Sequence, residues 1–195
     1  MKFLAIVGTN SDQSTNRQLL QFMQQHFSDQ ADIELFEIKD LPAFNEPEDK
    51  QAPEGIQILS DKILQADGII MSTPEYDHSI PAALKSVIEW ISYTTRALID
   101  KPVMITGASL GALGSSRAQA HLRQILDAPE VKARIMPSAE FLLGHSSTAF
   151  DEAGNLIDQD KVKELEMCFE EFLLFVEITH HLIDRKKAIE AAQED

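Results

Sequence analysis

The sequence has very few of the residues that build cross-linked or membrane-spanning proteins. It contains one cysteine, Cys168, so a disulfide within the chain is excluded. No apolar stretch approaches the roughly 18 residues that a membrane-spanning helix needs. Residues Met1–Asn10 hold fewer apolar side chains than the ~7–15 of a signal peptide's hydrophobic segment. We therefore expect a cytoplasmic protein with no membrane partner, in which Cys168 is a small core residue.

Basic residues are also scarce. The chain has 17 lysines and arginines against 32 aspartates and glutamates, a formal net charge of −15. A field of this sign repels nucleic acid and anionic membrane surfaces, so we expect neither as a partner. It also repels anionic ligands at long range. Any phosphate site must therefore be made by local hydrogen-bond donors.

The 195 residues show an alternation of strand and helix patterns that predicts one α/β domain, residues 1–195. The expected strands are Phe3–Val7, Ile33–Ile38, Gly68–Ser72, Pro102–Thr106 and, interrupted by Pro137, Ile135–Leu143. The expected helices are Ser14–Phe27, Glu54–Gln65, Pro81–Leu98, Ser116–Leu126 and one that starts near Asp158. This order predicts a flavodoxin-like three-layer sandwich with a five-stranded parallel sheet of order 2-1-3-4-5.

The last helix has a buried face at helical spacing, and its middle, Phe172–Ile178, is apolar on nearly every side. Cover from a second surface explains this pattern, and wider burial within the subunit explains it equally well. We expect the helix to run to about residue 185. The polar tail Lys186–Asp195 is then expected to fray.

Polar loops follow three of the expected strands, at the sheet edge where doubly wound folds bind ligands. The first, Gly8–Asn16, is rich in hydroxyl and amide side chains and leads into a helix. A helix N-terminus can hold a phosphate through its free N–H groups, although the same residue types are ordinary helix caps. The loop is neither a Walker A motif nor a G-x-G-x-x-G fingerprint, which disfavours nucleoside triphosphates and a Rossmann-type site.

The other two loops suit a flat ligand. Thr73–Pro81 carries prolines that stiffen it, and Tyr76 within it can lie beside a heterocycle, although surface packing explains this residue too. His78 has no paired nucleophile in the sequence and is assigned no catalytic role. Gly107–Gly114 contains three glycines, which permit close approach of the backbone to a ligand and also suit a flexible turn.

Together these loops resemble a known family, the NADPH-dependent FMN reductases, which include flavin, quinone, azo-dye and chromate reductases. The resemblance covers nearly the whole chain and rests on GTN–STN, TPEY–HSIPAALKSVIEWIS and KPVMITGAS–G–LGSSRAQAHLRQIL. It implies an enzyme that passes hydride from NADPH or NADH through bound FMN to a small acceptor. A flavin, a quinone, an azo compound and a metal oxyanion are the acceptor classes that it suggests.

The resemblance also assigns cofactor-binding residues by position. It places the FMN phosphate at the first loop, the isoalloxazine ring along the second and the pyrimidine side of the ring at the third. The residues are, in that order, Thr9, Asn10, Ser14, Thr15 and Asn16; Pro74, Glu75, Tyr76, Asp77 and His78; and Ser109, Leu110 and Gly111. Because the flavin carries the chemistry, no catalytic acid, base, nucleophile or metal ligand is assigned.

Family members are commonly dimers or tetramers, so the resemblance implies a homodimer or homotetramer. The helices Pro81–Leu98 and Arg117–Leu126 match those used for dimerisation in the family. The first of them has more apolar surface than we expect one sheet face to cover, which predicts an interface. The residues concerned are Ala82, Val87, Ile88, Trp90 and Ile91.

The chain departs from the family pattern at two places. Ser11 stands where many members have an arginine, which leaves phosphate affinity and the NADPH preference open. The usual PEYN-G reads Glu75-Tyr76-Asp77-His78, which leaves the shape of the substrate pocket open. Two alternatives to the reductase remain at this point. They are a flavodoxin-like one-electron carrier and a flavin-binding module without reductase turnover.

Overall fold

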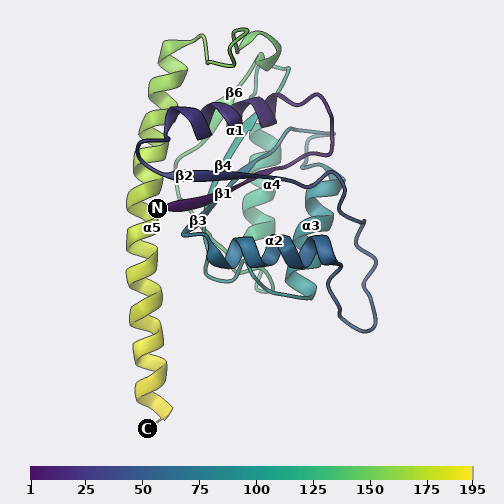
Figure 1. Ribbon diagram of the computed structural model, residues 1–195, viewed down its shortest axis with the longest axis vertical. Coiled ribbons are helices and arrows are strands. Elements are labelled where there is room, and N and C mark those ends of the chain that lie inside the picture. The colour runs from purple at the N-terminus through teal and green to yellow at the C-terminus, as the bar shows by residue number, and fades with distance from the viewer. Residues whose placement is uncertain (195) are drawn as a thin grey trace.

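The computed structural model describes residues 1–194 and has three layers around one parallel sheet (Figure 1). In this part of the chain the strands are β1 (Lys2–Val7), β2 (Asp32–Glu37), β3 (Gly68–Ser72), β4 (Pro102–Ala108), β5 (Arg134–Ile135) and β6 (Phe141–Leu143). They pair in the order β2-β1-β3-β4-β5, and β6 also pairs with β4. The predicted flavodoxin-like order 2-1-3-4-5 is confirmed.

The fifth strand differs from the prediction of one interrupted strand over Ile135–Leu143. The structure divides this segment into β5 and β6, and both pair with β4, at Pro102–Val103 and at Thr106–Ala108. Pro137 has no N–H to donate to a ladder, and Ser138 after it has a positive φ of 64°. The chain therefore leaves the sheet at this point and rejoins the same neighbour further along.

Helices cover both faces of the sheet. They are α1 (Thr15–His26), α2 (Glu54–Gln65), α3 (Ala82–Tyr93), α4 (Ser116–Leu126) and α5 (Gln159–Glu194), with a 3₁₀ turn η1 (Ser146–Thr148). Alternate residues of β1 point to opposite faces. Phe3 and Ala5 pack in the core that α1 and α5 close, whereas Leu4 and Ile6 pack in the core beneath α2, α3 and α4.

The apolar surface of α3 is covered within the subunit. Val87, Ile88, Trp90 and Ile91 are at most 3% exposed, and only Ala82 of the five predicted interface residues is exposed. The sheet covers most of this surface, and the segment after β2 covers Trp90. Trp90 donates from Nε1 to the carbonyl of Pro42 at 2.9 Å, and its ring meets the Phe44 ring edge-on. The reason for predicting an interface on this helix is therefore wrong.

The last helix is longer than the sequence predicts. It continues past residue 185 to Glu194, and its end projects beyond the body of the domain (Figure 1). Residues 186–194 contain three alanines and no glycine or proline, and helix propensity favours continuation over the frayed tail that we expected. Asp195 lies outside the described residues. Among residues 1–194 we find no helix with the length and apolar character to cross a membrane.

Candidate functional site

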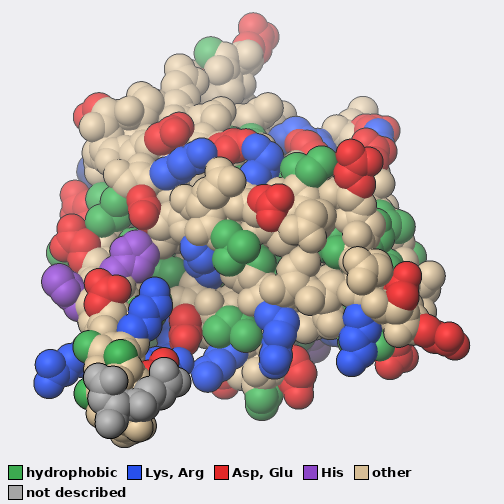
Figure 2. All heavy atoms as spheres, turned by 60° about the horizontal axis from the view of Figure 1, so that its bottom comes forward, with side chains coloured by type: hydrophobic (Ala, Val, Ile, Leu, Met, Phe, Trp, Pro, Cys, Tyr) green, Lys and Arg blue, Asp and Glu red, His purple; other side chains and the backbone are tan. Residues whose placement is uncertain are grey.

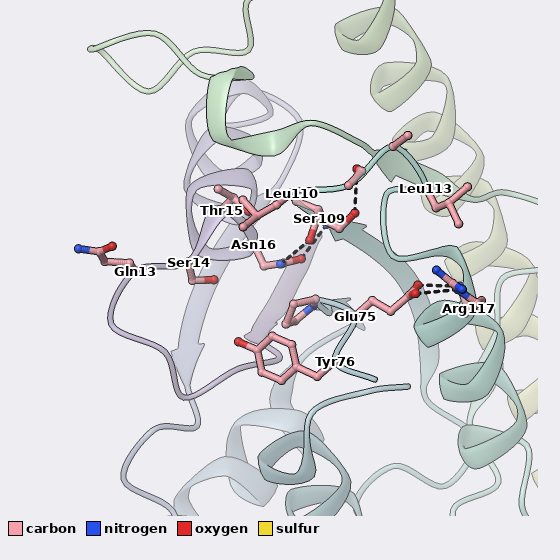
Figure 3. Close-up of a pocket in the computed structure, with 14 residues that line it drawn as sticks. Gln13, Ser14, Thr15, Asn16, Glu75, Tyr76, Ser109, Leu110, Leu113 and Arg117 are labelled. Carbon is pink, nitrogen blue, oxygen red and sulfur yellow. Dashed lines mark hydrogen bonds and ion pairs between the residues drawn. The ribbon is translucent and has the colours of Figure 1, made fainter. Parts of the chain in front are cut away.

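The three polar loops meet at the carboxyl edge of the sheet and enclose a cavity of about 660 Å³ (Figure 3). The loops follow β1, β3 and β4, whose ends lie side by side because these strands are neighbours. This volume lies within the range of about 300–1,000 Å³ for small-molecule sites. The cavity lies beside the point where the strand order reverses, as expected for a doubly wound sheet.

The loop after β1 presents the start of α1 to the cavity. Ser14 caps the helix, and its Oγ accepts a hydrogen bond from the N–H of Arg17 at 3.2 Å. Within the described residues, the N–H groups of Thr15 and Asn16 have no acceptor. The positive end of the helix dipole is at the same place. This edge of the cavity can therefore bind an anion without a lysine or arginine in contact.

Charged side chains brace the same loop from outside the cavity. Arg17 donates to the carbonyls of Ser11 and Asp12, both at 3.0 Å, and its Nε and Nη2 bind the carboxylate of Glu37. A hydrogen bond from Lys39 holds the pKa of the Asp12 carboxyl below its ordinary value. The hydrogen bond to Glu37 likewise raises the pKa of Arg17. These pairs hold the loop in shape although Ser11 replaces the arginine of many family members.

Asn16 joins the start of α1 to two strands. Its Oδ1 accepts from the N–H of Ala108 at 2.9 Å and from the hydroxyl of Ser72 at 2.8 Å. Its Nδ2 donates to the carbonyl of Ala108 at 2.9 Å. Three of the four hydrogen-bonding positions of the amide are thus used inside the protein, and the side chain is only 2% exposed. Asn16 positions the loop, and only one N–H of its amide remains for a ligand.

Two further hydroxyls of the first loop are engaged by distant segments. The Oγ1 of Thr9 lies 3.2 Å from the Tyr76 hydroxyl and also accepts from the N–H of Ser11. The Oγ1 of Thr15 lies 2.8 Å from the Oγ of Ser146, a buried residue of η1. Thr9 therefore supports Tyr76 from behind, and Thr15 faces the cavity with a partner that the sequence did not indicate.

The loop after β3 forms a tight two-residue turn. Tyr76 and Ser79 exchange both backbone hydrogen bonds at 2.9 Å, and Asp77 and His78 between them have φ of 48° and 63°. Positive φ at both central residues is the geometry of a type I′ turn, which prefers Asn-Gly. The turn thus keeps the shape that an Asn-Gly pair adopts without strain, although neither residue here is glycine. Asp77 and His78 are exposed and do not line the cavity.

Glu75 links this loop to α4. Its carboxylate accepts from the Nε of Arg117 at 2.7 Å and from the N–H of Arg117 at 3.1 Å, in the first turn of the helix (Figure 3). Arg117 also donates from Nη1 to the Nε2 of His78 at 2.8 Å. Glu75 is nearly buried, with a side chain 10% exposed. Arg117 lines the cavity with its charge already paired.

The loop after β4 also lines the cavity. Its glycines differ in function. A Cβ on Gly107 would lie 2.0 Å from the Ser115 Oγ, and Gly114 has a φ of +57°, so the fold itself requires both. A Cβ on Gly111 would meet no atom within 4 Å. In residues 1–194 the N–H groups of Leu110 and Gly111 also lack acceptors, so this loop leaves open space and free donors beside the cavity.

The structure brings most of the sequence-assigned residues to the cavity, but not all of them. Those that line it are Ser14, Thr15, Asn16, Pro74, Glu75, Tyr76, Ser109, Leu110 and Gly111, and those that do not are Thr9, Asn10, Asp77 and His78. Lining residues that the sequence did not indicate are Gln13, Ala108, Ala112, Leu113 and Arg117. Ala112 and Leu113 continue the third loop and were open to inference, whereas Arg117 reaches the site only through its pairing with Glu75.

Comparisons with known proteins agree with this geometry. The model of the NADPH-dependent FMN reductase family matches residues 1–148. The chain is 64% identical over 189 residues to the NADH:(hydroxy)cinnamate reductase subunit CrdA of Vibrio ruber, covering 97% of this chain and 94% of the relative. It is 45% identical over 182 residues to the NADH-dependent flavin reductase subunit 2 of Lactobacillus johnsonii, covering 91% and 98%.

A solved structure is similar over nearly the same length. FerB of Paracoccus denitrificans, described as a flavoenzyme NAD(P)H:(acceptor) oxidoreductase, superposes with a TM-score of 0.80 at 27% identity. The match covers 91% of this chain and 98% of that one.

Proposed function

The chain belongs to the NADPH-dependent FMN reductase family and is an FMN-dependent NAD(P)H oxidoreductase; from this premise we propose that its flavin binds in the cavity at the carboxyl edge of the sheet. When bound, FMN takes two electrons and a proton from NAD(P)H and delivers them to an acceptor. The relatives are reductases, and nothing favours the one-electron carrier over the enzyme.

The observation that carries the site proposal is the set of free backbone donors on two of the loops that line the cavity. The N–H groups of Thr15 and Asn16, with the Ser14 hydroxyl, suit the phosphate at the positive end of α1. The N–H groups of Leu110 and Gly111 suit the carbonyl edge of the ring, where reduction increases negative charge. Pro74 and Tyr76 also line the cavity, and Figure 3 shows the ring of Tyr76 at its edge, where it can lie beside a flat ligand.

We propose NADH as the preferred reductant. Among the lining residues of the cavity the cation is Arg117, and Glu75 pairs with it. A 2′-phosphate of NADPH therefore meets no unpaired cation there, and it enters the field of a chain with a net charge of −15. The two most similar relatives that we describe are named as NADH-dependent enzymes.

We propose that the acceptor is a small, planar aromatic or quinoid molecule. The lining of the cavity includes exposed apolar side chains, with Leu110 71%, Leu113 54% and Tyr76 47% exposed. Such a lining favours a flat apolar molecule over a highly charged one.

The net negative charge of the chain supports the proposal that nucleic acid is not a partner. A lone buried thiol, Cys168, is in keeping with the cytoplasmic location that we propose.

The site proposal is tested at Gly111. Because a Cβ there meets no atom within 4 Å and Gly111 lines the cavity, Gly111→Val is expected to leave the fold intact and to fill space that we assign to the flavin. We expect FMN binding to weaken at least about tenfold, with the unfolding temperature of the flavin-free protein unchanged. Gly111→Ala is the graded control and has a smaller effect. Unchanged FMN affinity in the valine variant would place the flavin elsewhere.

The activity is tested with the purified flavoprotein. Mass spectrometry of the released flavin is expected to show FMN, since the cavity offers one phosphate site and the sequence no adenylate motif. Steady-state oxidation of NADH and NADPH with free FMN, a quinone, a hydroxycinnamate, an azo dye, a ferric chelate and oxygen identifies reductant and acceptor. Recovery of FAD, or a lower kcat/KM for NADH than for NADPH with every acceptor, would contradict these assignments.

A further inference from the structure

The outer face of α5 carries a row of large apolar side chains that the subunit does not cover. The exposed fractions are 68% for Met167, 60% for Leu174, 66% for Ile178, 52% for Leu182 and 49% for Ile189. The opposite face of the same helix is buried against the sheet through Leu165, Phe169, Phe172 and Val176. Contiguous exposed apolar side chains of this size mark an interaction surface.

The row is symmetric about Ile178. Leu174 and Leu182 lie four residues before and after it, and Met167 and Ile189 lie eleven residues before and after it. The charged residues in the row obey the same symmetry, since Glu171 and Arg185 lie seven residues before and after Ile178. All seven residues recur at spacings of three and four, so they form one stripe along the helix. We call this row of seven residues the α5 stripe.

This symmetry suits one kind of partner. If a second α5 runs antiparallel with a two-fold axis at Ile178, Leu174 meets Leu182 and Met167 meets Ile189 at each end. The same register places Glu171 of each copy opposite Arg185 of the other, which gives two ion pairs. A parallel pair in register would instead set each charge against its like. An interface made by one patch on both copies is the usual arrangement in a two-fold dimer.

The charges of the α5 stripe are available for such pairing. Glu171 and Arg185 are exposed, and within residues 1–194 neither forms an ion pair or a side-chain hydrogen bond. Lys186, next to Arg185, forms an ion pair with Asp100 of the same subunit at 3.1 Å, so its charge is already paired. The spacing of the stripe, close to 3.67 residues per turn over the row, is near the 3.6 of an α-helix, so the stripe stays on one side of α5 along its length.

The projecting end of α5 points to the same partner. Figure 1 shows the last turns of the helix running past the body of the domain. Figure 2 looks at this end and shows apolar side chains among charged ones of both signs and histidines around it. Leu182 and Ile189 gain little cover from their own subunit. In an antiparallel pair each projecting end lies along the first half of the partner helix, where Met167 and Leu174 are exposed.

We propose that the α5 stripe is a homodimer interface in which two copies of α5 pack antiparallel about Ile178. The sequence analysis expected an interface on α3 from its apolar residues, and this proposal places the interface on α5 instead. It does not depend on the reductase activity. Charge and spacing select a second copy of this chain, because a helix of another polypeptide has no reason to share the symmetry about Ile178.

The first test measures the mass of the full-length flavoprotein and of charge variants by light scattering and sedimentation. We expect a dimer for the parent chain. Glu171→Arg and Arg185→Glu each place like charges opposite one another twice, and each is expected to raise the dissociation constant at least about tenfold. Mixing the two variants restores both ion pairs between unlike copies, so the mixture dimerises again. The double variant Glu171→Arg/Arg185→Glu also dimerises.

Controls separate this result from damage to the fold. Glu190→Arg makes the same change of charge on another face of the helix and is expected to leave the mass unchanged. Helical circular dichroism and FMN binding report folding in every variant. Ile178→Asp places two carboxylates at the two-fold axis and is expected to abolish the dimer. A monomeric parent chain, or a dimer that none of these stripe variants weakens, would overturn the proposal.

A second test fixes the register. In a Cys168→Ser background, Ile178→Cys faces its own copy at the axis and is expected to cross-link under mild oxidation. Glu177→Cys points to another side of the helix and is expected not to do so. Leu174→Cys is expected to cross-link to Leu182→Cys in a mixture and not to itself. Cross-linking of Leu174→Cys to itself would show parallel helices and contradict the proposed interface.

Discussion

At the scale of single residues, the polar groups of the first loop divide into those that are free to bond a ligand in the cavity and those that hold the loop. Ser14 caps α1 and keeps its own hydroxyl proton free to donate. Asn16 instead connects α1 with Ser72 and Ala108 through three hydrogen bonds. Substitutions at Ser14 and Asn16 are therefore expected to have different consequences, although the sequence assigns both residues to the FMN phosphate.

We predict that Ser14→Ala weakens FMN binding by about tenfold to a hundredfold, since a hydrogen bond to a charged group contributes about 1.5–3 kcal/mol. Loss of the cap costs only about 1 kcal/mol of stability. Titration of the flavin-free protein with FMN, followed by flavin fluorescence, measures the affinity. Thermal unfolding of the same samples is the control. Parent-like affinity would show that the phosphate lies elsewhere.

For Asn16→Ala we predict mainly a loss of stability, because the N–H of Ala108 and the hydroxyl of Ser72 lose a buried acceptor. Each buried group left unpaired costs about 1–3 kcal/mol. The free energy of unfolding from urea titration is the measurement, with Ser14→Ala as the matched control. A variant as stable as the parent would contradict the positioning role.

The turn at Asp77 and His78 gives another prediction at this scale. His78 has a φ of 63°, a conformation that glycine adopts without steric cost. Relief of this strain in His78→Gly is therefore expected to stabilise the protein by about 0.5–1 kcal/mol. The loss of the hydrogen bond between His78 and Arg117 reduces this gain. His121→Gly, inside α4, is the matched control and is expected to destabilise by about 1 kcal/mol. Equal losses at both positions would show that the turn is not strained.

At the scale of elements, one carboxylate adds a polar tie between α5 and the rest of the domain, beyond the buried apolar face of the helix. Asp100 binds Arg134 at 2.7 Å and Lys186 of α5 at 3.1 Å. Burial favours the neutral acid, but hydrogen bonds from Lys186 and Arg134 together with their charges outweigh it. The pKa of Asp100 therefore lies below its ordinary value of 3.8.

The sign of the pH dependence follows from this depressed pKa. The stabilisation is fully present above the ordinary pKa and is lost as the pH falls through the lower pKa of the folded state. We predict that Asp100→Asn lowers the free energy of unfolding at pH 7 by about 1 kcal/mol. The difference from the parent is expected to shrink below about pH 4. Urea titrations at several pH values measure it, and a difference that is constant with pH would contradict the assignment.

At the scale of the whole molecule, the net charge of −15 acts on every anionic ligand that approaches. The repulsion grows with ligand charge and is screened over about 10 Å at 0.1 M salt. We predict that kcat/KM for NADPH rises more steeply with ionic strength than kcat/KM for NADH. Steady-state rates from low to moderate sodium chloride measure both slopes, with a neutral osmolyte as control. Equal slopes would show that the field does not reach the site.

The whole fold also shows which features local sequence patterns determine and which they do not. Apolar periodicity and helix caps are local features, set within a few turns of chain. The sequence alone therefore determined the layers, the order 2-1-3-4-5 and the sheet edge where the cavity lies. It missed the division of the fifth strand and the length of α5. Pro137 divided the apolar run that predicted one strand, and helix propensity outweighed the polarity of the tail.

Only the tertiary structure decided which polar side chains face the cavity. Asn16 is held by Ala108 and Thr15 by Ser146, partners that lie far away in the chain. Arg117 reaches the site because Glu75, on another loop, binds it, whereas the I′ turn points His78 out of the cavity. Local patterns place a residue on a loop, but the direction of its side chain depends on contacts that folding alone brings together.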